Sequence, residues 1–134
     1  MLTFGLLKFF QPFHGWFDVQ IRQSHLPQAA ILLGKLGEMA TGVLFLLPQL
    51  RRSLPERDKR RLLLLAGSSL TFEMAVAIYV HLQPQVPPAV LPLGIKPPVI
   101  PLAVLVLGII VVIAVWEERH TEHASPVTEK EGRR

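Results

Sequence analysis

Residues 29–48 read AAILLGKLGEMATGVLFLLP and are apolar except for Lys35, Glu38 and Thr41. At 1.5 Å per residue, a helix of about 20 residues crosses the roughly 30 Å hydrocarbon core of a bilayer. Two similar stretches follow, at residues 62–81 (LLLLAGSSLTFEMAVAIYVH) and 99–116 (VIPLAVLVLGIIVVIAVW). None of the three shows the polar face that a surface helix of a soluble domain carries at the 3.6-residue period. The pattern predicts an all-α integral membrane helical bundle with three full spans.

The composition of the whole chain points the same way. Of its 134 residues, 50% are hydrophobic and only 18% are charged, too few to cover the exterior of a soluble domain of this size. There is no cysteine, which excludes disulfides, thiolate metal sites and a thiol–disulfide relay. A redox role would therefore have to run through a bound cofactor or a partner protein.

The positive charge is concentrated in one loop, QLRRSLPERDKRR at residues 49–61. Its six Lys or Arg and two acidic residues give +4, which equals the net charge of the chain. The chain therefore has no basic face for nucleic acid, and we expect the lipid bilayer as its main partner. Basic loops face the cytoplasm, so loop 49–61 and the C-terminus are expected on the cytoplasmic side of the inner membrane. Residues 1–120 form the expected bundle, and residues 121–134 form a polar tail expected to be disordered.

The N-terminal residues 2–13, LTFGLLKFFQPF, are apolar but too short to span a bilayer, and Lys8 interrupts them. Two interpretations stay open. The segment is an interfacial amphipathic helix, or it is the outer half of a spanning helix that begins upstream of Met1. The second interpretation makes the fold a four-helix bundle with an incomplete first helix.

Residues 82–98 connect the last two spans and contain six prolines, so neither a regular helix nor a sheet strand is expected there. The segment is interpreted either as a stiff extended connector on the outer side or as a lid over a ligand cavity.

Three charged residues inside the predicted spans are the candidate site: Lys35, Glu38 and Glu73. Charges inside a membrane span are costly to bury, which makes them functional candidates. Lys35 and Glu38 share one helix face, and Glu73 lies at a similar depth on the next span. Two carboxylates and one ammonium then meet near the midplane, and the extra carboxylate is a candidate to move a proton or to donate a hydrogen bond. The alternative is a buried ion pair that fixes helix register. No metal-ligand spacing occurs, so no metal site is predicted.

Three segments resemble the DoxX and DoxX-like membrane proteins: GLLKFF (residues 5–10), LGKLGEMATGVLFLLP (33–48) and HLQPQVP…LPLGIKPPVIP (81–101). The resemblance covers most of residues 5–116, and this chain departs from it at the start, where only the end of the first helix is present. It implies a small four-helix membrane protein, associated with redox or quinone chemistry, that acts as an accessory subunit beside membrane or redox partner proteins. A quinone is the cofactor that it implies.

A second class stays open, that of a small proton-coupled transporter using Glu38 or Glu73. Lys35 beside Glu38 argues against it, because the ammonium would neutralise a cation-binding carboxylate.

Overall fold

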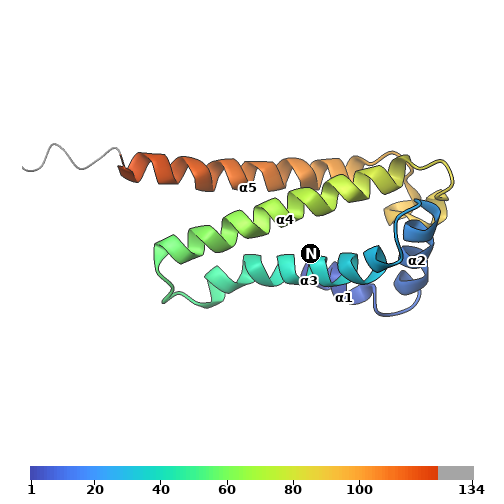
Figure 1. Ribbon diagram of the computed structural model, residues 1–134, viewed down its shortest axis with the longest axis horizontal. Helices are drawn as coiled ribbons and strands as arrows, with labels where there is room; N and C mark the ends of the chain where they lie inside the picture. Colours follow the sequence, from blue (N-terminus) through green and yellow to red (C-terminus); the bar gives the residue numbers. More distant parts are fainter. Residues whose placement is uncertain (124–134) are drawn as a thin grey trace, which may run out of the picture.

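In the computed structural model, which describes residues 1–123 and the side chains of residues 1–117, all regular structure is helical. The α-helices are α1 (Leu2–Leu7), α2 (Phe13–Gln23), α3 (Ala29–Leu50), α4 (Glu56–Leu82) and α5 (Val99–His123), and two short 3-10 helices, η1 (Pro88–Val90) and η2 (Pro92–Gly94), lie between α4 and α5. Figure 1 shows the long helices lying side by side. The predicted all-α class is confirmed.

Among the described residues, three helices are long and apolar enough to cross a membrane: α3, α4 and the part of α5 from Val99 to Glu117. These are the three spans that the sequence predicts. Their ends extend further, because α4 begins at Glu56, within the basic loop, and α5 continues to His123. The first three residues of the predicted tail are therefore helical, and residues 124–134 of that tail lie outside the described residues.

The helices pack in a row, with α1 on α3, α3 on α4, and α4 on α5 (Figure 1). Small residues allow these approaches. A methyl group added at Gly42 would lie 2.4 Å from the backbone nitrogen of Leu2, and one added at Gly67 would lie 2.8 Å from Val112. α4 is therefore the central helix, with α3 on one side and α5 on the other.

The N-terminal residues form two helices with different positions. The short helix α1 lies along α3, because Gly5 contacts Met39 and Leu2 contacts Gly42. The short helix α1 is thus packed along one of the three long apolar helices. The position across the end of the bundle belongs instead to α2 (Figure 1), which buries Phe17 and Ile21.

The proline-rich connection folds back over the same end of the bundle. The Lys96 ammonium donates hydrogen bonds to the carbonyls of Gln83 and Val86, and the Gln20 amide of α2 donates to the carbonyl of Val90. The interpretation as an extended connector is therefore wrong, because two 3-10 turns make the segment compact. We call α2 together with residues 83–98 the capped end.

A small apolar core explains why this connection holds its shape. Its buried members are Val80, Val86 and Leu91, and Leu26 and Val90 pack against them. The cluster joins the end of α4, the 3-10 turns and the segment after α2, so the capped end is a packed unit.

Candidate functional site

The structure separates Lys35 from Glu38 and Glu73, with which it was predicted to share one site. Lys35 turns toward α2, where its Nζ lies 2.8 Å from Nδ1 of His14 and 3.5 Å from Oδ1 of Asp18. Glu38, one turn later on α3, forms an ion pair with Lys8. The ammonium that accompanies Glu38 therefore comes from Lys8, the residue at the C-terminal cap of α1, and Lys35 belongs to a different group of contacts.

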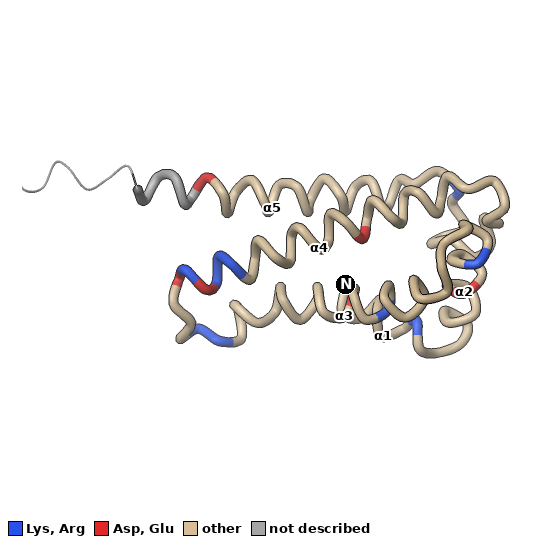
Figure 2. The backbone as a smooth tube through the Cα atoms, in the orientation of Figure 1, with Lys and Arg blue, Asp and Glu red and all other residues tan. Residues whose placement is uncertain are grey.

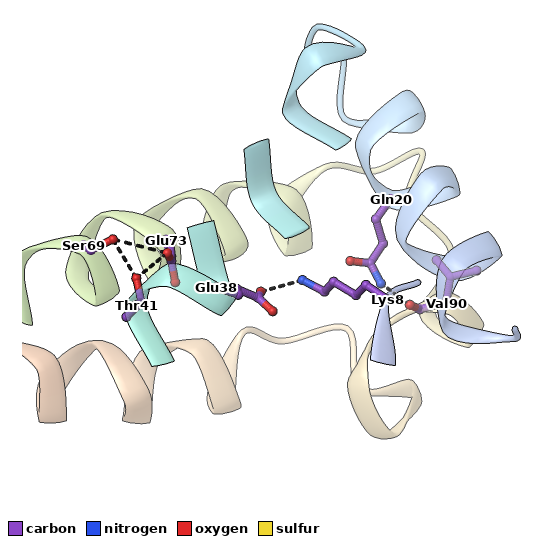
Figure 3. Close-up of polar contacts among 7 residues, drawn as sticks. All are labelled: Lys8, Gln20, Glu38, Thr41, Ser69, Glu73 and Val90. Carbon is purple, nitrogen blue, oxygen red and sulfur yellow. Dashed lines mark hydrogen bonds and ion pairs between the residues drawn. The ribbon is translucent and has the colours of Figure 1, made fainter. Parts of the chain in front are cut away.

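Glu73 of α4 lies in a hydroxyl network with Thr41 of α3 and Ser69 of α4 (Figure 3). The Thr41 Oγ1 is 2.7 Å from the Glu73 Oε1 and 2.7 Å from the Ser69 Oγ. Each hydroxyl carries only one proton, so when Thr41 donates to the carboxylate it accepts from Ser69. Thr41 is fully buried, with 0% of its surface accessible, so its hydroxyl makes these hydrogen bonds inside the helix pair.

The ion pair of Lys8 and Glu38 is also enclosed. The two side chains keep only 20% and 13% of their surface accessible. The Lys8 ammonium lies 3.9 Å from the ring centroid of Phe17, a cation–π contact that adds to the ion pair. Residues from α1, α2 and α3 therefore combine around a single charge pair.

The ion pair and the hydroxyl network lie close together, with Glu38 between Lys8 and the Thr41–Glu73 pair in Figure 3. A methyl group added at Gly37, next to Glu38 in the chain, would lie 3.1 Å from the Oε1 of Glu73. We call the five residues the polar centre: Lys8, Glu38, Thr41, Ser69 and Glu73. It holds two carboxylates and one ammonium, which is the balance that the sequence predicts, with Lys8 in place of Lys35.

Two atoms of the polar centre stand out chemically. The Oε2 atoms of Glu38 and Glu73 are buried and have no hydrogen-bond partner among the described residues. A buried polar atom in this state requires a proton, a water molecule or a ligand group as its partner. Glu73 requires such a partner more than Glu38 does, because Glu38 is paired with the Lys8 ammonium whereas Glu73 has only hydroxyl partners. The arrangement suits a group that takes up and gives back a proton.

The contacts of Lys35 form a second cluster, at the junction with the capped end. Lys35 is 4% exposed and donates to Nδ1 of His14, so that nitrogen carries the lone pair. The Oδ1 of Asp18, also on α2, lies 3.5 Å from the Lys35 ammonium. These contacts join α2 to α3, and we interpret the cluster as structural.

Within the described part of the chain, no three His, Asp or Glu side chains gather in a group that could hold a metal ion. No protein-family model, curated protein or solved structure matches this chain. Fold and site together define the class: an all-helical chain with three helices apolar enough to span a membrane and a polar centre between its first helix, α3 and α4.

Proposed function

We propose that this protein is a multi-pass subunit of a redox complex in the cytoplasmic membrane, and that its polar centre exchanges a proton or a hydrogen bond with a quinone. The observation that carries the proposal is the Oε2 of Glu73, which is buried without a hydrogen-bond partner while its Oε1 is held by Thr41. The resemblance of residues 5–10, 33–48 and 81–101 to DoxX-like proteins supports the same role, as an accessory subunit beside membrane or redox partners.

The residues present fit such a ligand. A quinone presents carbonyl oxygens, which are hydrogen-bond acceptors, and it supplies two-electron redox chemistry when bound. A protonated Glu73 has its second oxygen available as a donor, since Thr41 occupies the first. The role of Thr41 and Ser69 is to orient the carboxyl group, and the role of Lys8 is to keep Glu38 from competing for the same proton.

The orientation in the membrane forms part of the proposal. The basic loop 49–61 faces the cytoplasm, and the capped end, with Lys96 as the one basic residue of residues 82–98, faces outward. Because α5 runs antiparallel to α4, its C-terminal end lies on the cytoplasmic side.

A second candidate function is a small proton-coupled transporter. The structure removes one argument against it, because Lys35 does not neutralise the candidate carboxylate. Glu73 has hydroxyl partners and Lys8 is paired with Glu38, so Glu73 is the carboxylate that would bind the coupled proton.

Purification in a mild detergent, followed by extraction of bound quinone and identification of co-purifying proteins, tests the first proposal. The wild-type protein should retain quinone, and Glu73→Leu should lose it. Ser68→Ala is the matched control, because Ser68 adjoins Ser69 on α4 but is exposed. Retention of quinone by a folded Glu73→Leu variant would refute the quinone role. Proton uptake that depends on Glu73 in quinone-free proteoliposomes would support the transporter instead.

A further inference from the structure

The basic end of the molecule, residues 51–61, carries more positive charge than any other segment of similar length. Its cationic residues are Arg51, Arg52, Arg57, Lys59, Arg60 and Arg61. Figure 2 shows Lys and Arg gathered where α3 ends and α4 begins. The segment holds only two acidic residues, so it keeps a charge of +4.

The two carboxylates of this segment are already engaged within α4. Glu56 pairs with Lys59 at 2.7 Å, and Asp58 pairs with Arg61 at 3.7 Å. Both pairs join residues three positions apart on the first turns of the helix, so neither carboxylate is directed at the arginines before α4. The side chains of Arg51, Arg52 and Arg57 are exposed.

The place of this positive charge, at the ends of two apolar helices, indicates what kind of partner binds there. Arg51 directly follows Leu50, the last residue of α3, whose surface is 77% exposed. At the other side, Leu62 opens the apolar part of α4 directly after Arg61. An exposed apolar side chain and two spanning helices thus lie directly beside the guanidinium groups. An anionic phospholipid carries the complementary groups, a negatively charged phosphate next to apolar acyl chains.

We propose that the basic end is a binding site for anionic phospholipids, whose headgroup phosphates are held by the arginines while the acyl chains lie along α3 and α4. Guanidinium groups bind phosphate oxygens through two parallel hydrogen bonds, and clusters of four to eight Lys or Arg next to a spanning helix attract anionic lipid. This inference is independent of the polar centre and of any quinone, so its test can fail without affecting the proposed function.

Trp116 provides an intrinsic reporter for this site. Gly67 of α4 lies against Val112 of α5, and the two helices are antiparallel, which places Trp116 of α5 near the level of Leu63 of α4. With the other tryptophan removed by Trp16→Phe, the emission of Trp116 reports quenching by lipids with brominated acyl chains. Reconstitution into bilayers that contain either brominated phosphatidylglycerol or brominated phosphatidylcholine then measures the relative affinity for the two headgroups.

We expect phosphatidylglycerol to be preferred over phosphatidylcholine by about fivefold at low salt, and by less in 0.5 M salt, which screens surface charge. The variant Arg51→Gln/Arg52→Gln/Arg57→Gln should lower this ratio to about one. Arg22→Gln, at the exposed side of α2 in the capped end, is the matched control and should leave the ratio unchanged.

Three results would overturn the proposal. The first is equal quenching by the two lipids in the wild-type protein, and the second is an unchanged ratio in the triple variant. The third is loss of the preference when inorganic phosphate is added at constant ionic strength, which would reveal a site for small anions in place of a lipid site.

Discussion

Replacement of Lys8 by methionine tests whether the polar centre is assembled as the contacts indicate. Lys8→Met keeps most of the apolar stem and removes the ammonium, so Glu38 loses its ion-pair partner. Glu38 keeps 13% of its surface accessible and its Oε2 already has no hydrogen-bond partner among the described residues. Removal of one partner from a buried ion pair costs about 3–5 kcal/mol. Because Lys8 is one-fifth accessible, we expect the lower value, a loss of about 3 kcal/mol in the free energy of unfolding.

The double variant Lys8→Met/Glu38→Gln should recover most of this loss, because it leaves no unpaired charge. Unfolding in mixed micelles of dodecyl maltoside and sodium dodecyl sulfate, followed by circular dichroism, measures all the variants of the cycle. The coupling free energy between Lys8 and Glu38 should be about 2 kcal/mol. Lys35→Met combined with Glu38→Gln is the matched comparison, and there the two effects should add to within about 0.5 kcal/mol.

The reasoning fails if Lys35 and Glu38 prove coupled while Lys8 and Glu38 do not. That result would restore the grouping predicted from the sequence, with Lys35 as the counter-ion of Glu38. Additive effects for both pairs would mean that neither lysine contacts Glu38.

Two further predictions concern packing and orientation. Gly67→Ala should destabilise the α4–α5 pair by about 1–3 kcal/mol, because the new methyl group would lie 2.8 Å from the Val112 side chain, whereas the exposed Ser68→Ala should change the free energy of unfolding by less than about 0.5 kcal/mol in the same assay. Single cysteines introduced into this cysteine-free chain report its orientation in the membrane. In intact cells, an impermeant thiol reagent should label Gln85→Cys and leave Ser53→Cys unlabelled. The reverse pattern would mean that the topology is opposite to the one proposed.

The spanning helices could be predicted from the sequence because their signal is local. About 20 apolar residues in a row require a helix in hydrocarbon, whatever the rest of the chain does. The helix α2 carries a weaker local signal, with Phe13, Trp16, Phe17 and Ile21 at helical spacing. That pattern is typical of an amphipathic helix. The segment is short and contains polar residues, so its signal is weaker than that of the spans and it was not predicted.

The partners of the charged residues could not be predicted in the same way. Depth along a helix follows from counting residues, and Glu73 contacts α3 at the level of Gly37 and Thr41, on either side of Glu38. The direction of a side chain depends on which neighbouring helix packs against its own helix. Lys35 is directed to α2, which was not predicted, and Lys8 lies on a helix whose position beside α3 depends on the contacts of Gly5 and Gly42.

The two charges of α3 both have partners among residues that precede it in the chain. Lys8 pairs with Glu38, and His14 and Asp18 contact Lys35. On the insertion scale, each of the two charges costs about 2.5–3.5 kcal/mol at the centre of a helix, while each large aliphatic residue gains only about 0.3–0.6 kcal/mol. The ten or so large apolar residues of α3 gain about 3–6 kcal/mol, which is no more than the cost of about 5–7 kcal/mol for Lys35 and Glu38 together.

The N-terminal helices thus act as the counter-charges of α3. This explains why the short helix α1 lies against α3, since Lys8 at its C-terminal cap must reach Glu38. It also explains why α2 lies across the end of the bundle, where His14 and Asp18 contact the buried Lys35. The apolar window of α5, from Val99 to Trp116, contains no charge and needs no such partner.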